Sequence, residues 1–481
     1  MLSPDESDVL TRHVAMGFYF SPRGGSAQVA RYLCTALDAE RWAATLYSGS
    51  VGSPVDNGNA AMFFCGIDCR SLDYTAARAD WLNGGDPMVA PVPMHASFED
   101  KANVPDRILL GLDDDACRRQ VRSWTDFLAL NSARPPDVVH LHHLTPMHQA
   151  IQDLWPDVPI ITHLHGTELK MLTLAAVAPS HWSSRWVERM RGWAAASQRL
   201  VVVSRQDHEL AVKLLGVETD RLVTIANGVD TDVFSVHERS GSASRRAGWQ
   251  EWLVDDPRGW KPGEDAGSIR YRQEDLAAFD GDDGDLVPVV LFAGRFMQFK
   301  RLQLLIEAHE EMQRAGHPPC VLVIAGGYPG EWEGEHPYDT VQRLGARNVF
   351  FLGWRDHHHL AEILGCVDVF AAPSVDEPFG LVYLEAMAAG VAPIATATGG
   401  PLSFINVDPQ LPTGWLVAPD DRGALVAALV EAVSDREQLS SRGKRAAHFV
   451  GEHYSWSQAA RSFEDLYDTV IDETSLSALS R

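Results

Sequence analysis

The sequence has little positive charge and no long apolar run. Its 41 lysines and arginines stand against 65 aspartates and glutamates, which gives a formal net charge of −24 at pH 7. Such a charge argues against non-specific nucleic-acid binding and against docking on an anionic membrane by bulk electrostatics. No uninterrupted apolar run is long enough to span a bilayer, so we expect no stable membrane insertion.

Cysteine is also scarce. The six cysteines form no C-x-x-C pair, and only Cys65 and Cys69 lie close together. Scattered thiols are typical of reduced core residues rather than of a disulfide framework. The segment 1–8 is acidic and polar, without the basic start and apolar run of a signal peptide. These features predict a cytoplasmic protein.

What is present is the composition of an ordinary globular protein at multidomain length. The apolar fraction is 45%, and 481 residues are enough for two or three domains with large cores. Apolar runs at 13–20 and 287–292 read as buried strands, and predicted helices follow them at 27–37 and 302–312. We predict an α/β fold.

The most informative stretch is 375–390. Glu377 stands just before a helix that is predicted to start near Phe379, and Gly390 ends that helix. Glu385 lies inside this otherwise apolar helix, with no basic residue three or four positions away. A carboxylate in an apolar surface needs hydrogen-bond donors, and the diol of a ligand can supply them. The alternative is a buried helix whose Glu385 is paired with a distant arginine.

The start of the same helix can bind an anion. Backbone N–H groups at Phe379, Gly380 and Leu381 are available there, and Gly380 has no side chain to keep a phosphate away. The stretch therefore offers two carboxylates, Glu377 and Glu385, with an anion-binding helix start between them.

Glu-Pro-Phe-Gly-Leu at 377–381 followed by Glu-Ala-Met-Ala-Ala-Gly at 385–390 resembles the E-x7-E motif of retaining glycosyltransferases of the glycogen-synthase-like family four. The resemblance implies the GT-B fold, in which two Rossmann-like, doubly wound parallel-sheet domains face each other across a cleft. It also implies that Glu385 binds the donor ribose and that Glu377 holds sugar hydroxyls. The N–H groups at 379–381 would bind the sugar and phosphate.

Other segments of the second half match the same family in the right order. Arg295 and Lys300 resemble the Arg and Lys of its G-R-x5-K segment, which holds the donor diphosphate. Two cations on a strand-to-helix loop can neutralise a leaving diphosphate. The segment 349–355 matches the strand and loop beside the nucleotide base, so either Trp354 or Arg355 flanks that base.

The first half contains a Gly-Gly loop between a strand and a helix. Gly24 and Gly25 can hold a phosphate on backbone N–H groups. They do not form the G-x-G-x-x-G fingerprint, which disfavours a nicotinamide enzyme. The loop resembles the one that faces the donor diphosphate and the acceptor in this family. The segment 227–234, which begins with Asn-Gly-Val-Asp and ends with Phe234, is similar to the segment that ends the family's N-terminal domain. We assign Asn227 to the acceptor side.

Five histidines stand at the ends of two predicted strands, at 137–143 and 159–168. They suggest a metal site, but their spacing fits no familiar zinc pattern. They also suggest the lining of a cleft, because ligands bind at the carboxyl ends of strands in open α/β sheets. The run 164–168 resembles the family segment whose histidine contacts the donor sugar. That match makes His165 the candidate. His163, two residues earlier on the same strand face, is the second choice, and we assign it to the acceptor side. We expect no metal and no other cofactor.

Two segments depart from the family pattern. The family usually has a glutamate three residues after the second glycine of Gly399-Gly400, where this chain has Ser403, so the role of that loop is open. The segment 237–285 is longer than the expected interdomain connection and contains three tryptophans. The three tryptophans predict a segment that folds onto another part of a protein instead of remaining a flexible linker. A surface insertion ranks first, with a lid or a subunit contact as alternatives.

The family motifs and the change of composition near 237–285 together divide the chain into four parts. We predict a Rossmann-like acceptor-side domain at 1–235 and an insertion or linker at 236–285. A Rossmann-like nucleotide-sugar-binding domain follows at 286–455, and a helix at 456–481 crosses back to the first domain.

The resemblance implies a retaining hexosyltransferase that moves a sugar from a nucleotide-diphosphate sugar, with a UDP-sugar favoured, to a small soluble acceptor. His165, Glu377, Arg295 and Lys300 are the predicted catalytic residues, and no metal takes part. The partners are small molecules and not nucleic acid, and a homo-oligomer is compatible with the sequence. The alternatives are a sugar-nucleotide epimerase or hydrolase, a lipid-acceptor transferase, and a non-catalytic nucleotide-sugar-binding subunit.

Overall fold

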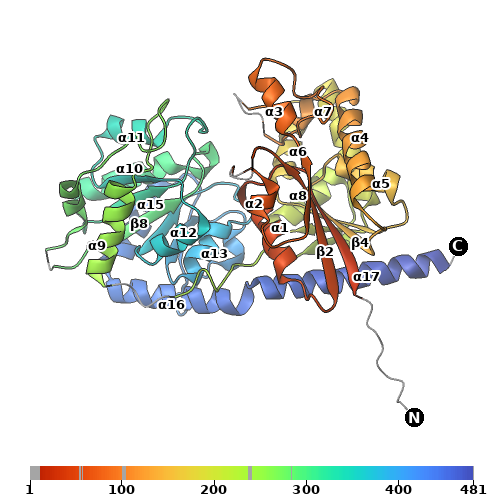
Figure 1. The fold of residues 1–481 in the computed structure, drawn as a ribbon. Helices are drawn as coiled ribbons and strands as arrows, with labels where there is room; N and C mark the ends of the chain where they lie inside the picture. The colour runs from red at the N-terminus through yellow and green to blue at the C-terminus, as the bar shows by residue number, and fades with distance from the viewer. Residues whose placement is uncertain are drawn as a thin grey trace, which may run out of the picture. The chain divides into compact units, whose positions relative to one another are not determined.

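The structure, a computed structural model, consists of two compact units (Figure 1). Unit 1 is formed by 1–227 and 456–481, and unit 2 by 228–455. The sequence placed the end of the first domain at 235, and the observed division falls at 227. The residues described are 11–53, 56, 58–99, 104–236, 241–282 and 284–479.

Unit 1 contains a seven-stranded sheet, and all its strand pairs are parallel. The spatial order is β3-β2-β1-β4-β5-β6-β7. The strands are β1 (Arg12–Phe18), β2 (Trp42–Ser50), β3 (Cys69–Asp73), β4 (Val138–His142), β5 (Ile160–His163), β6 (Arg199–Val202) and β7 (Leu222–Thr224). Every residue of β4 and β5 is buried, as expected for a parallel sheet with both faces covered.

Helices cover both faces of this sheet. On one face, α1 (Gly24–Ala36) lies beside the chain's last helix, α17 (Trp456–Leu479), and both contribute to one apolar core (Figure 1). The other core contains residues of α4 (Asp114–Asn131), α5 (Met147–Leu154), α6 (Thr167–Val177), α7 (His181–Ala196) and α8 (Arg205–Leu215). The shorter elements are α2 (Ala60–Phe63), α3 (Thr75–Leu82) and the 3-10 turns at Leu109–Gly111 and Thr219–Arg221.

Unit 2 contains a six-stranded sheet whose strands are also all parallel, in the order β10-β9-β8-β11-β12-β13. The strands are β8 (Val289–Ala293), β9 (Val321–Ala325), β10 (Val349–Gly353), β11 (Val369–Ala372), β12 (Ala392–Thr396) and β13 (Trp415–Val417). The helices are α10 (Leu302–Arg314), α11 (Pro337–Leu344), α12 (His357–Leu364), α13 (Leu381–Ala388), α14 (Pro401–Phe404), α15 (Arg422–Ser434) and α16 (Arg436–His453). A 3-10 turn, Gln298–Lys300, precedes α10.

The tryptophan-containing segment belongs to unit 2 and packs along its edge strand β10. It forms α9 (Ser242–Gln250), a π-helical turn at Glu251–Asp255 and a 3-10 helix at Gln273–Phe279. The N–H of Phe351 in β10 donates to the Tyr271 hydroxyl at 2.9 Å, so the segment satisfies a backbone group of the strand that ends the sheet. Trp249, Trp252 and Trp260 are 1%, 5% and 1% exposed. The prediction that this segment folds onto the protein is confirmed.

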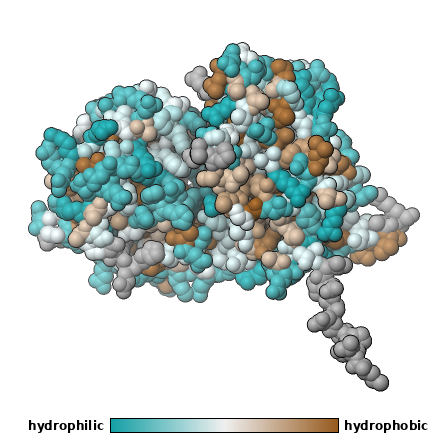
Figure 2. Space-filling view, viewed as in Figure 1, coloured by the Kyte–Doolittle hydropathy of each residue, from teal (hydrophilic) through white to brown (hydrophobic). Residues whose placement is uncertain are grey.

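The surface of unit 2 is largely polar on the face shown in Figure 2, where apolar residues occur only in small groups. Among the described helices, none is both long enough and apolar enough to cross a membrane.

Candidate active site

In unit 2 the order of the strands reverses between β8 and β11, which are neighbours in the sheet. The chain continues from β8 outward to β9 and β10, and from β11 outward to β12 and β13 on the opposite side. In open parallel sheets, ligands bind beyond the carboxyl ends of the strands at such a point. The loops that follow β8 and β11 carry the predicted residues Arg295, Lys300 and Glu377.

These two loops are joined through both backbone and side chains. The N–H of Val375 donates to the carbonyl of Phe299 at 2.8 Å. Beside this contact the ammonium of Lys300 is bonded to the carboxylate of Glu377, and the two side chains are only 13% and 11% exposed. An ion pair so far removed from water is stronger than one on the surface. Arg295 lies half-buried in the same loop as Lys300.

A glycine pair supports the backbone around Glu377. The N–H of Gly400 donates to the carbonyl of Glu377 at 2.9 Å. A methyl group at Gly399 would stand 2.1 Å from that carbonyl oxygen, and one at Gly400 would stand 2.0 Å from the carbonyl oxygen of Phe379. No side chain fits at either position. The sequence left the role of this loop open because of Ser403. The structure shows that its two glycines pack against the backbone at Glu377 and Phe379.

Helix α13 begins directly after this loop. Its N-cap is Gly380, which has φ of 92°, and a side chain there would stand 2.6 Å from the ring of Tyr383. Phe379 is 4% exposed, and its ring packs against Phe404 at a centroid distance of 5.7 Å. Phe379 can therefore offer a ligand its backbone but not its ring. Leu381 is the first residue of the helix.

Glu385 is 7% exposed in α13, and burial raises its pKa to about 8. No basic residue accompanies it along its own helix, but the tertiary structure brings His357 from the start of α12. The His357 Nδ1 lies 3.5 Å from Glu385 Oε1, and its ring meets that of Phe234 edge to face at 5.9 Å. The basic side chain beside Glu385 is therefore a histidine and not the distant arginine of the alternative interpretation. His357 is not among the residues predicted from the sequence, because only its position just after the β10 loop points to the site.

The two residues proposed to flank the base have different surroundings. Trp354 is half-buried, and its ring lies 5.6 Å from that of Tyr328. Arg355 is turned to the tryptophan-containing segment: it donates to the Asp256 carboxylate at 2.6 Å and to the carbonyl of Trp252 at 2.9 Å. Because its guanidinium is engaged there, we retain Trp354 and not Arg355 for the base.

Unit 1 has a corresponding reversal between β1 and β4. Gly24 and Gly25 follow β1 and open helix α1, and both are exposed. Gly24 has φ of 72°, and a side chain there would meet nothing within 4 Å. An anion can therefore approach the first turn of α1, as the sequence analysis proposed.

His165 follows β5 and is half-buried. Its Nε2 lies 3.0 Å from His142 Nδ1, and its backbone N–H donates to the carboxylate of Glu168 at 3.3 Å. Glu168 is fully buried and also bonds His143 at 3.2 Å. Burial and the neighbouring histidines hold the pKa of His165 well below its usual range, so the ring is neutral at pH 7. A neutral imidazole can hydrogen-bond a sugar hydroxyl.

The two acceptor-side predictions fare differently. His163 is 0% exposed in β5, beneath the rings of His165 and Phe463, so it cannot reach an acceptor from this position. The prediction of His163 as an acceptor contact is therefore withdrawn. Asn227 is 5% exposed at the end of unit 1, and nothing in the structure tests its role.

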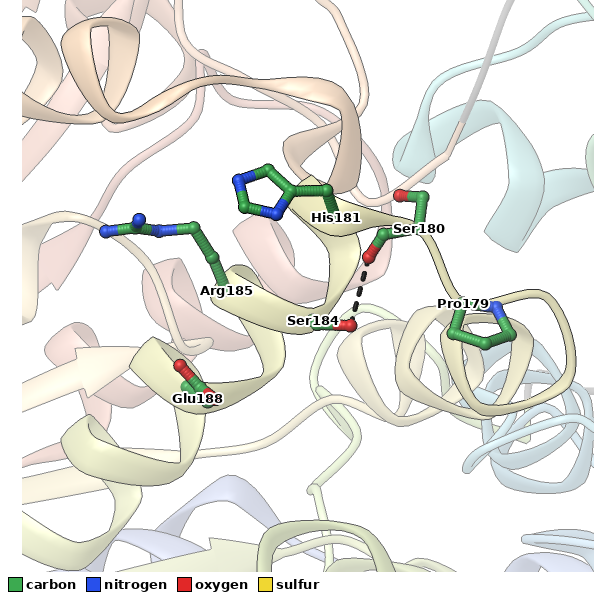
Figure 3. A pocket seen from close by; sticks show the side chains of 6 residues that line it. All are labelled: Pro179, Ser180, His181, Ser184, Arg185 and Glu188. Carbon is green, nitrogen blue, oxygen red and sulfur yellow. Dashed lines mark hydrogen bonds between the residues drawn. The ribbon is translucent and has the colours of Figure 1, made fainter.

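A surface hollow of about 590 Å³ lies at the start of α7, apart from these residues (Figure 3). It is lined by Pro179, Ser180, His181, Ser184, Arg185 and Glu188. Ser184 donates to the carbonyl of Ser180 at 3.0 Å, and Arg185 pairs with Asp114 at 2.7 Å. None of the residues predicted for the site lines this hollow, so we do not take it as the candidate active site.

Two family models match the chain in succession. The model for glycosyltransferase family 4 matches residues 23–233, and the model for glycosyl transferases group 1 matches residues 282–449. This chain is a family-four glycosyltransferase. It belongs to the retaining type with the GT-B fold, as the sequence analysis predicted, and it uses nucleotide sugars.

Relatives and solved structures agree with this assignment. The glycosyltransferase is 28% identical over 344 residues to a D-inositol 3-phosphate glycosyltransferase of Corynebacterium aurimucosum, covering 69% of this chain and 71% of the relative. Its fold is similar to that of a sucrose-phosphate synthase from Thermosynechococcus elongatus, with a TM-score of 0.65, 20% identity and coverage of 96% and 100%. It is also similar to the Anabaena protein HepE in complex with UDP and glucose, with a TM-score of 0.62, 15% identity and coverage of 95% and 99%.

Proposed function

We propose that this glycosyltransferase moves a hexosyl group from a UDP-sugar to a small soluble acceptor with retention of configuration. The observation that carries the proposal is the buried Lys300–Glu377 pair at the β8/β11 reversal. The solved complex of HepE contains UDP and glucose, which supports the choice of donor. The name of the Corynebacterium relative includes a small polyol phosphate, which supports a small acceptor.

In the proposed reaction the bond between the anomeric carbon and the diphosphate oxygen breaks, and its electron pair stays on the diphosphate. Arg295 and Lys300 stabilise the negative charge that develops there. The acceptor hydroxyl bonds to the anomeric carbon on the face that the diphosphate leaves, and its proton passes to a phosphate oxygen. Lys300 shares its three N–H groups between Glu377 and the diphosphate, so Glu377 fixes the ammonium while accepting from sugar hydroxyls.

The remaining roles follow from the surroundings of each residue. Glu385 accepts hydrogen bonds from the ribose hydroxyls, and Trp354 packs on the base. The first turn of α13, Gly380 and Leu381, offers backbone N–H groups to the sugar and phosphate. His165 orients the sugar as a neutral imidazole, and Gly24 and Gly25 leave the start of α1 open to an anion.

The proposed transfer uses no metal ion at the diphosphate, because the two cationic side chains supply the positive charge. We propose a cytoplasmic location, which the six free cysteines support. The net charge of −24 supports small molecules rather than nucleic acid as partners.

A thermal-shift panel with UDP, GDP and ADP and their common sugars, with and without EDTA, tests the donor proposal. A ligand at about a hundred times its Kd adds about 2.7 kcal/mol to the stability of the folded form. We expect the uridine compounds to raise the midpoint temperature of unfolding, with or without EDTA. Glu385→Ala and Arg295→Ala should each abolish this rise. A shift only with another nucleotide would overturn the choice of UDP, and a shift that survives both substitutions would overturn the site.

Product analysis separates the proposed transfer from its rivals. Consumption of donor without an acceptor would identify an epimerase or hydrolase, and tight donor binding that Glu377→Ala leaves without effect on any reaction would identify a binding subunit. Transfer to lipid vesicles but not to soluble polyols would identify a lipid acceptor. NMR of the new glycosidic bond should show the anomeric configuration of the donor.

A further inference from the structure

Three histidines of unit 1 meet inside the protein. His142 of β4 and His163 of β5 are partners in the register of the sheet, and His140 lies on the same face two residues before His142. Their exposed fractions are 0% for His140, 1% for His142 and 0% for His163. One ring nitrogen from each lies within 4.8 Å of the others. The cluster, which we call the histidine triad, is therefore buried and convergent.

Two members of the triad are held from outside through one nitrogen. His140 Nδ1 lies 2.6 Å from the hydroxyl of Tyr467 in α17, and His142 Nδ1 lies 3.0 Å from His165 Nε2. Their Nε2 atoms, and both ring nitrogens of His163, have no hydrogen-bond partner in the described part of the chain. Metal-binding histidines typically show this arrangement, in which an outer partner holds one nitrogen and the other faces the ion.

Another buried histidine of unit 1 has a partner at each ring nitrogen. His148, also 0% exposed in unit 1, has Nδ1 at 3.1 Å from the carbonyl of Thr145 and Nε2 at 2.8 Å from the hydroxyl of Thr162. Buried polar atoms without partners are rare in native proteins and point to a water molecule or an ion. Other buried ring nitrogens of unit 1, such as His13 Nδ1 and Trp42 Nε1, also lack a partner among the described residues, but those of the triad belong to side chains that meet in one cluster.

The chemistry of the triad selects a class of ion. Burial holds the pKa values of all three rings well below the usual range, so each ring is neutral and has a lone pair to donate. Imidazole nitrogens suit zinc and other first-row transition ions, whereas magnesium and calcium prefer oxygen.

We propose that His140, His142 and His163 bind one divalent transition-metal ion, zinc in the first instance, as a structural site within unit 1. Zinc–nitrogen bonds of about 2.1 Å with tetrahedral angles place the ligand nitrogens about 3.4 Å apart. In the structure the three nitrogens lie within 4.8 Å of one another, so the rings turn toward one another when the ion enters. A water molecule completes the four ligands. The site joins β4, β5 and, through Tyr467, the C-terminal helix.

Metal content is the direct test. The full chain is purified from cells grown with added zinc, passed through gel filtration in metal-free buffer and analysed by mass spectrometry for metals. We expect about one zinc ion per chain in the wild type and at least a tenfold loss in His163→Leu. His163→Cys, which replaces one ligand by another, should keep the ion. His148→Leu is the matched control, and it should keep the ion as well.

Cobalt binding provides a second test that uses only the wild-type protein, so it does not depend on whether a variant folds. Refolding the wild-type chain with Co²⁺ should give the intense visible absorption of tetrahedral cobalt, and zinc should displace it. A wild-type protein without metal and without this absorption overturns the proposal and leaves water at the triad. Equal metal content in wild type and folded His163→Leu also overturns it, because the ion then lies elsewhere.

Discussion

The ammonium of Lys300 is bonded to the carboxylate of Glu377, 77 residues further along the chain. The bond joins the loop after β8 to the loop after β11, at the place where the strand order of unit 2 reverses. Each residue belongs to a different sequence motif, and each was predicted to contact a different part of the donor. Their pairing means that the diphosphate side and the sugar side of the proposed site are linked before a donor arrives.

We expect Lys300→Met and Glu377→Gln each to lower kcat by about 100-fold to 1000-fold, because each removes a preorganised charge from the reacting groups. The double variant should be little worse than either single variant, since residues that act as a unit are not additive. Initial rates of sugar transfer at saturating donor measure this. Lys261→Ala, which removes a half-buried lysine of the same unit, is the control. A kcat within threefold of the wild type for Lys300→Met would contradict the proposed role.

We expect donor binding at pH 7 to release close to one proton. The pKa of Glu385 is raised to about 8 by burial, so the free enzyme is protonated there, and ribose hydroxyls that donate to the carboxylate favour its charged form. Isothermal titration calorimetry in buffers of different ionisation enthalpy measures the release. The Glu385→Gln variant should bind more weakly and release no proton. Equal release from both proteins would assign the proton to another group.

The same carboxyl group should make stability depend on pH. Its pKa rises on folding from 4.5 to about 8, so the folded form binds more protons than the unfolded form between these values. The stabilisation is complete below pH 4.5 and is lost as the pH rises through 8. Relative to Glu385→Gln, the wild type should lose up to about 4 kcal/mol over this range, since one pKa unit corresponds to about 1.4 kcal/mol. Urea unfolding of both proteins at pH 5 and pH 8 provides the comparison.

We expect Gly400→Ala to lower activity at least tenfold while the rest of unit 2 stays folded. The backbone of Gly400 has φ of −55°, which alanine adopts freely, so the defect is the contact of 2.0 Å with the carbonyl oxygen of Phe379. Moving that carbonyl displaces Glu377 and the start of α13. Gly423→Ala is the control, because its nearest contact is 3.5 Å. Steady-state kinetics should show the loss of activity in Gly400→Ala and not in Gly423→Ala. Equal activity of the two variants would show that the loop does not support the site.

We expect Asp256→Ala to loosen the tryptophan-containing segment. It leaves the guanidinium of Arg355, whose side chain is 2% exposed, without its carboxylate and with only backbone carbonyls as acceptors, at a cost of about 1 to 3 kcal/mol. Hydrogen exchange of 241–282 should rise in this variant. Arg258→Ala removes the more exposed partner of the same carboxylate and should cost less than about 1 kcal/mol. Similar exchange in both variants would show that the Arg355 contact does not hold the segment.

The contrast between Trp354 and Arg355 shows where sequence reasoning stops. The two residues are adjacent, and both fitted the family's base-side position equally well. The guanidinium of Arg355 is held by Asp256 and Trp252, and both lie in a segment that departs from the family pattern. His357 was missed for the same reason, because its contact with Glu385 depends on how α12 and α13 pack. Contacts between residues far apart in the chain leave no local pattern to read.

The sequence by itself determined the fold class, the enzyme family and the identity of the charged residues around the proposed donor. These depend on local patterns: apolar strand runs, glycines at turns and the spacing of Glu377 and Glu385. Only the tertiary structure decided which of these groups meet. It paired Lys300 with Glu377, buried His163 beyond the reach of an acceptor and brought three histidines of two strands together. The physical reason is that burial and long-range contact arise when elements pack, and packing is a property of the whole fold rather than of any one segment.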